Sequence, residues 1–85
     1  MSEWPKYESH KIVQAAKIVN QQRDAEGEVV SVEVILPDGD KEWFQATVPA
    51  MTAKANIGDW AMLYPDGFKS ISPAKAFEEG YTLCP

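Results

Sequence analysis

Residues 29–36 alternate between inward and outward positions, which is the pattern of a β-strand with one buried face. The residues expected on the buried face are Val30, Val32, Val34 and Leu36. A Pro-Asp-Gly-Asp turn at 37–40 ends the strand, and residues 42–48 predict the second arm of a hairpin. On that arm Phe44, Ala46 and Val48 would share one face. Proline ends the arm at position 49, and the alanine-rich stretch 50–56 predicts one helical turn.

Residues 10–20 fit two patterns. Ile12, Ala15, Ala16 and Val19 have helical i, i+3, i+4, i+7 spacing. The same segment also alternates at period two, with Ile12, Ala16 and Ile18 on one side and Val13, Ala15 and Val19 on the other. The β-branched residues favour a strand, and the helix stays as the alternative. The polar stretch 20–27 is interpreted as a solvated loop.

The last third of the chain predicts a strand, a turn, a second strand and a capped helix. In the first strand Trp60, Met62 and Tyr64 lie on one side, and Ala61 and Leu63 on the other. Another Pro-Asp-Gly turn at 65–67 reverses the chain, and residues 68–71 pair back. For the helix, we expect Ser72 as N-cap, Pro73 at the first position and Gly80 at C′, which predicts about two turns at 73–79. Ala76 and Phe77 would turn inward, and residues 81–83 predict a short closing strand.

A chain of 85 residues has room for one domain with one modest core. Its 45% hydrophobic and 25% charged residues are ordinary for a globular protein. We therefore predict a single domain over 1–85, with 1–9 as an extended leader. The predicted fold class is mainly β (α+β): an antiparallel sheet or a partly closed barrel of about five strands, with one short C-terminal helix.

The charge and the cysteine content bound the environment and the partners. A net charge of −5, with scattered basic residues, argues against binding to nucleic-acid backbones. It leaves open a basic partner or an imitation of nucleic acid. The single cysteine, Cys84, fits a reducing compartment. Because the sequence has no spanning apolar run and no secretion signal, we expect no membrane association and a location in a cytoplasm.

The chain offers little catalytic machinery, and we predict that it is not an enzyme. His10 and Cys84 are the single members of their kinds, and Ser9 beside His10 makes no dyad because adjacent side chains diverge. Asp38, Asp40 and Glu42 match only the first half of a calcium loop and are interpreted as a solvated turn. We expect no metal and no cofactor.

Nine aromatic residues, 11% of the chain, exceed what so small a core must bury. Trp and Tyr are favoured at binding surfaces, because they combine a large apolar area with a polar group. The candidate interaction residues are Trp4, Tyr7, Trp43, Trp60, Tyr64, Phe68 and Tyr81. Trp4 and Tyr7 either pack as a lid over the sheet or dock on a second copy.

Both ends of the chain carry distinctive short motifs. Near the N-terminus these are Ser9-His10-Lys11 and Ala16-Lys17-Ile18. Residues 58–81 contain a glycine-aromatic strand, an Asp-Gly turn, a Ser-Pro helix start and Phe-Glu-Glu-Gly-Tyr. In these motifs the chain resembles small accessory proteins encoded by tailed phages and prophages, and it departs from that group in carrying Asp59-Trp60 and Pro65. The resemblance implies a phage origin and an accessory role during infection, and it supplies no functional residue.

The expected function is non-catalytic binding to a host protein or self-association. One alternative is an anti-defence protein that sequesters a nucleotide-like ligand, with Lys11, Lys69 or Arg23 meeting phosphate and Trp60 or Tyr64 stacking on base. A second alternative is a minor virion or structural protein.

Overall fold

The computed structural model describes residues 3–9 and 12–84, which form seven strands and two short helices. The strands are β1 (Lys6–Glu8), β2 (Ile12–Arg23), β3 (Val29–Ile35), β4 (Lys41–Phe44), β5 (Trp60–Leu63), β6 (Lys69–Ser72) and β7 (Thr82–Leu83). The helices are α1 (Pro49–Ala53) and α2 (Ala74–Gly80). Neither of these described helices is long and apolar enough to cross a membrane. The prediction of a mainly β, antiparallel fold is confirmed, but the described residues form seven strands rather than about five, and two short helices rather than one.

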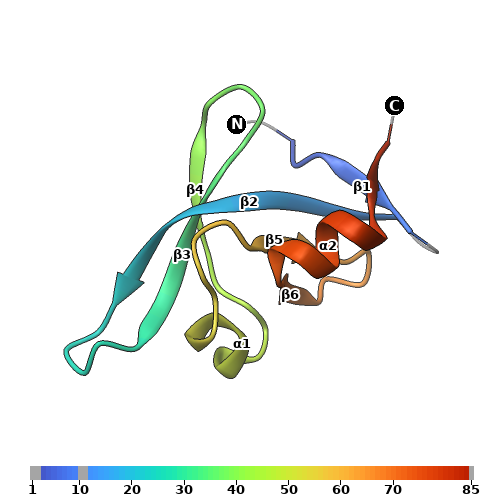
Figure 1. Ribbon diagram of the computed structural model, residues 1–85. Coiled ribbons are helices and arrows are strands. Elements are labelled where there is room, and N and C mark those ends of the chain that lie inside the picture. Colours follow the sequence, from blue (N-terminus) through green and yellow to red (C-terminus); the bar gives the residue numbers. More distant parts are fainter. Residues whose placement is uncertain (1–2, 10–11, 85) are drawn as a thin grey trace.

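The strand β2 is the centre of the sheet (Figure 1). Lys17 pairs with Ile35 of β3 and with Trp60 of β5, so β3 and β5 lie on opposite edges of β2. Near the start of β2, Gln14 pairs with β1 and with β5. Consequently β1 and β3 share one edge of β2. All pairings are antiparallel, and the path β4-β3-β2-β1-β7 ends in β4 and β7, which leaves the sheet open.

Residues of β2 are buried on both faces of the sheet, which explains the two overlapping patterns at 10–20. Ala16 and Ile18 belong to a first core, together with buried residues of β3, β4 and β5 and with Trp4. Val13 and Ala15 face the other way, into a second core that contains Met62 and Phe77. The strand interpretation of this segment is confirmed. His10 and Lys11 lie outside the described residues.

Two irregularities of register shift the predicted faces of β2 and β3. One lies between Ile18 and Asn20, and the other between Gln22 and Arg23. Opposite the shift between Gln22 and Arg23, the buried and exposed positions of β3 exchange places. Val29 is therefore buried and Val30 is 39% exposed. The prediction that Val30 faces the core is therefore wrong, whereas Val32, Val34 and Leu36 are buried as expected. The predicted loop 20–27 is also wrong at its start, because β2 continues to Arg23.

The second arm of the first hairpin is shorter than predicted. β4 ends at Phe44, and Val48 is exposed, although Phe44 and Ala46 are buried. Beyond β4, Thr47 N donates to Lys69 O and Lys69 N donates to Thr47 Oγ1, each at 2.8 Å. These bonds join the segment after β4 to the start of β6. The helical turn expected in 50–56 is confirmed as α1.

The helix expected at 73–79 is confirmed as α2 at 74–80, but its predicted caps are wrong. Ser72 makes no capping bond, and its Oγ instead contacts Pro73 O. Asp59 caps the helix from across the fold, because its Oδ1 accepts from Ala74 N at 3.0 Å. Gly80 is the last helical residue rather than C′. Phe77 points inward as predicted, whereas Ala76 is exposed.

Replacing the distant cap tests this arrangement. Asp59 Oδ2 also accepts from Asn56 N at 3.0 Å, so Asp59→Ala leaves two backbone donors without their acceptor. We expect a loss of about 1–2 kcal/mol in the free energy of unfolding, measured by urea denaturation. Ser72→Ala is the matched control and should cost less than about 0.5 kcal/mol. Equal losses in the two variants would contradict the assignment of the cap.

Candidate interaction surface

Four of the seven candidate aromatics pack in the second core. Phe77, on α2, is 1% exposed and lies between Trp60 and Tyr81, with ring centroids at 4.5 Å and 4.8 Å in stacked geometry. Tyr7 meets the Phe77 ring edge-on at 4.9 Å. Tyr64 packs against the same core. These rings fix α2 to the sheet, so their apolar area contributes to folding.

A polar group on the rim of this core holds Trp60 in place. Trp60 Nε1 donates to Glu78 Oε2 at 3.1 Å, and Lys17 Nζ lies 3.6 Å from the same oxygen. Lys17 Nζ also lies 5.7 Å from the Trp60 ring centroid, which is a cation–π distance. The three side chains connect β2, β5 and α2. Glu78 therefore has a structural role, because its carboxylate contacts both Trp60 and Lys17.

Two tyrosines of this core, Tyr7 and Tyr64, have a pKa raised above the ordinary value of a phenol. Burial raises the pKa of the Tyr7 phenol. Burial is also the main cause that raises the pKa of Tyr64, and the nearby Tyr81 and Asp66 raise it further. A phenol with a raised pKa is a poor proton acceptor near neutral pH. The arrangement supports packing rather than acid–base chemistry.

Trp4 and Phe68 also pack against other side chains of the protein. Trp4 is 8% exposed and packs against Phe44 at 5.6 Å between ring centroids. Its backbone carbonyl accepts from Gln14 Nε2 at 3.0 Å. Phe68 meets Tyr64 edge-on at 5.8 Å. Of the two alternatives for Trp4 and Tyr7, packing over the sheet describes their positions.

Trp43 is the candidate aromatic that differs from the others, because 52% of it is exposed. It lies on β4, the end strand of the sheet path, and pairs with Glu33 on the face opposite Val32 and Phe44. Beside it lies a cavity of about 420 Å³, here called the β4 groove. Its apolar lining comes from Trp4, Trp43, Phe44 and Leu63, and its charged lining from Glu42 and Lys69.

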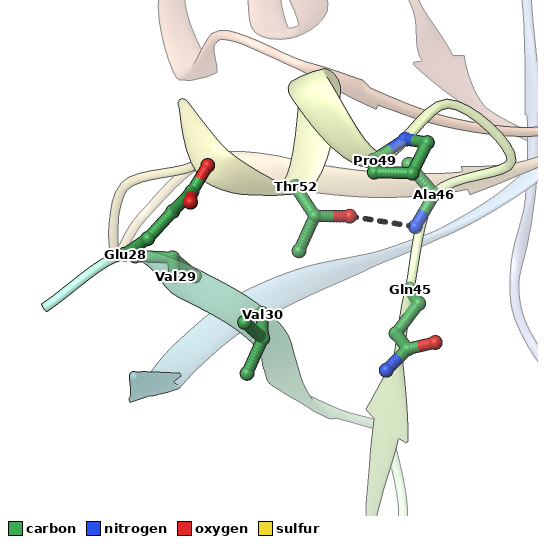
Figure 2. Close-up of a pocket in the computed structure, with 7 residues that line it drawn as sticks. All are labelled: Glu28, Val29, Val30, Gln45, Ala46, Pro49 and Thr52. Carbon is green, nitrogen blue, oxygen red and sulfur yellow. Dashed lines mark hydrogen bonds between the residues drawn. The ribbon is translucent and has the colours of Figure 1, made fainter. Parts of the chain in front are cut away.

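A second cleft, of about 280 Å³, lies where β3 extends past the end of β4. Figure 2 shows Val29 and Val30 on one wall and Gln45, Ala46 and Pro49 facing them. Thr52 Oγ1 accepts from Ala46 N at 2.9 Å, the dashed bond in Figure 2. That bond satisfies a backbone donor left over where β4 stops.

The described residues contain no group of three or more His, Cys, Asp or Glu placed to hold a metal ion. Asp38 Oδ1 accepts from Asp40 N at 2.9 Å, as expected for a turn. Cys84 is half-buried, and its backbone N–H donates to Lys6 O. The residues named for nucleotide binding are separated: Arg23 Nη1 donates to Gly27 O at 2.6 Å, and Lys69 lines the β4 groove. Lys11 lies outside the described residues.

Comparison with known proteins found no matching family model, no matching curated protein and no matching solved structure.

The β4 groove could not be found from the sequence, because its lining comes from five separate segments. Trp43 was named as a candidate on residue type alone. Phe44, Leu63 and Glu42 carried no signal that pointed to a groove, since alternation predicts only which face of a strand is buried. Their proximity to Trp4 depends on how the leader crosses the sheet.

Proposed function

We propose that this protein is a phage-encoded accessory protein that acts in the bacterial cytoplasm by binding a host protein, without catalysis. The observation that supports the proposal is the exposed Trp43 beside the β4 groove. Tryptophan is the residue type most enriched among those that dominate binding energy, particularly beside an apolar pocket. A phage origin and an accessory role rest on the resemblance of the chain ends.

Among the candidate aromatics, Trp43 is the one best placed to anchor a partner protein. Trp60, Tyr7 and Tyr81 are in ring contact with Phe77, and Trp4 packs against Phe44. Using any of these for a partner would break contacts that stabilise the fold. Burying Trp43 against a partner would not require breaking a ring contact of this kind. We therefore expect Trp43, at one edge of the sheet, to supply most of the binding energy.

Trp43→Ser is the variant that tests this proposal. Tagged wild-type protein should capture one host protein in stoichiometric amount from a bacterial lysate, and Trp43→Ser should lose at least about tenfold in affinity for it, as for a hot-spot residue. The thermal midpoint should change little, because Trp43 is half-exposed. Capture is measured by mass spectrometry, and affinity by titration of the purified partner.

Ile57→Ser is the matched control, because Ile57 is 60% exposed and lies outside the β4 groove. This variant should retain the partner. Capture by Trp43→Ser at wild-type affinity would exclude the groove as the binding surface. Native mass spectrometry of the wild type supplies a further check: a bound mass of a few hundred daltons in a symmetric oligomer would replace protein binding by ligand sequestration.

A further inference from the structure

We infer that the free edge of β4 binds an extended, basic segment of the partner polypeptide by strand addition. This inference rests on the proposed function and names the mode of binding and the chemistry of the partner. It follows from three features of the hairpin β3–β4: the direction of its backbone groups, the groove along its edge and its charge.

The backbone register shows which residues of β4 face outward. Leu36 N donates to Asp40 O at 2.8 Å, and Val34 pairs with Glu42. In an antiparallel ladder the backbone groups of successive residues alternate between the two edges. Glu42 and Phe44 therefore direct their N–H and C=O groups toward β3. Lys41, Trp43 and Gln45 direct theirs toward the other edge.

The row of outward-facing backbone groups is hydrogen-bonded to β6 at its far end. Thr47, the next residue in the row, exchanges two hydrogen bonds with Lys69. Before Thr47, none of the described strands pairs with this edge of β4. The β4 groove lies there instead. An unpaired edge with main-chain donors and acceptors, next to an apolar pocket, is the arrangement that peptide-binding sheets use for strand addition.

The groove offers a place for one side chain of an added strand. Trp4 and Phe44 are in ring contact and line it, together with Leu63. The charges of Glu42 and Lys69 lie on its walls. Because alternate side chains of a strand point to the same face, one apolar residue can enter the groove while its neighbours face outward. Main-chain bonds then supply affinity, and the groove selects the side chain.

The charge of the hairpin selects a basic segment. Residues 33–44 carry four carboxylates (Glu33, Asp38, Asp40 and Glu42) and one ammonium (Lys41), so these 12 of the 85 residues hold a net −3 of the total −5. None of these four carboxylates forms an ion pair within the described part of the chain. A Lys- or Arg-bearing strand would be attracted to this edge. A second copy would bring a like charge against it, which disfavours edge-to-edge self-association.

A short synthetic peptide provides the test. The probe is a seven-residue peptide in which lysines alternate with valine and threonine, and its control carries glutamate at each lysine position. We expect the basic peptide to slow amide hydrogen exchange at Lys41, Trp43 and Gln45, followed by NMR. Its affinity should fall as the ionic strength rises. The acidic peptide should bind more weakly.

Two variants separate the backbone and charge contributions. Gln45→Pro removes one outward N–H and should lower the affinity for the basic peptide about fivefold, the value of one hydrogen bond. Asp40→Asn combined with Glu42→Gln leaves the backbone intact and should reduce the salt dependence. Circular dichroism and the thermal midpoint confirm that each variant folds, and if Gln45→Pro does not, the charge variant alone decides.

Three outcomes of the peptide experiment would overturn the inference. They are failure of the basic peptide to bind, protection at the Val29–Val30 cleft instead of β4, and equal affinity for the acidic peptide. A wild-type dimer with protected β4 amides would identify a second copy as the occupant and also overturn it. If the peptide fails while partner capture still depends on Trp43, the proposed function stands and only the strand-addition mode is lost.

Discussion

Phe77→Ala should lower the free energy of unfolding by about 3–5 kcal/mol, the usual range for truncating a fully buried phenylalanine. Phe77 is 1% exposed, and three aromatic rings contact it. Its removal leaves a cavity between α2 and the sheet. A domain of this length has a total stability of roughly 4–13 kcal/mol, so the variant loses a large share of it. Urea denaturation followed by tryptophan fluorescence measures the change.

Two controls show whether the loss comes from the ring contacts. Phe77→Leu keeps an apolar side chain in place and should cost less than about 2 kcal/mol. Glu79→Ala, on the exposed side of the same helix, should change stability by less than about 0.5 kcal/mol. A cost below about 1 kcal/mol for Phe77→Ala would mean that α2 does not depend on the second core.

The sequence predicted the elements of this fold better than their ends. Period-two alternation identified β3 and β5, and for β5 it also assigned the faces: Trp60 and Met62 lie in or against the second core, and Ala61 and Leu63 in or against the first. The two Pro-Asp-Gly sequences predicted the turns of the hairpins β3–β4 and β5–β6. In these turns Gly39 and Gly67 each have a φ of 92°, which glycine adopts readily. These features depend on residues that are neighbours in the sequence, so a local sequence pattern can predict them.

The misplaced features depend on residues far apart in the chain. Asp59 caps α2 across 15 positions, a contact that no spacing rule for a local N-cap includes. The register shift opposite Val30 arises from pairing with β2, so alternation within β3 alone could not predict it. Both cases show tertiary pairing overriding a locally favourable pattern.

The candidate surface divides in the same way. Residue type identified seven aromatics, but their exposure depends on which elements cover them. Trp60 and Trp43 both lie on strands beside a hairpin turn or loop, yet α2 covers the first and leaves the second half-exposed. The charge of the hairpin was visible in the sequence. Its meaning depends on the free edge of β4, which only the sheet order reveals.

Ile18→Ala should cost about 2–5 kcal/mol, because Ile18 is 1% exposed and its truncation leaves a cavity in the first core. Val19→Ala, at the neighbouring half-buried position of β2, is the control and should cost distinctly less. Both variants are measured by urea denaturation, with circular dichroism as the signal. A loss for Ile18→Ala no larger than that for Val19→Ala would contradict the assignment of Ile18 to the core.

The two faces of β2 should also contribute independently. Ile18 and Phe77 lie in different cores, with the backbone of β2 and the small side chains of Ala15 and Ala16 between them. The milder pair Ile18→Val and Phe77→Leu should therefore add within about 0.5 kcal/mol in a double-mutant cycle. A coupling above about 1 kcal/mol would show that the cores behave as one packed unit. Additivity instead means that α2 and the second core can change without disturbing the first core, on which the β4 groove is built.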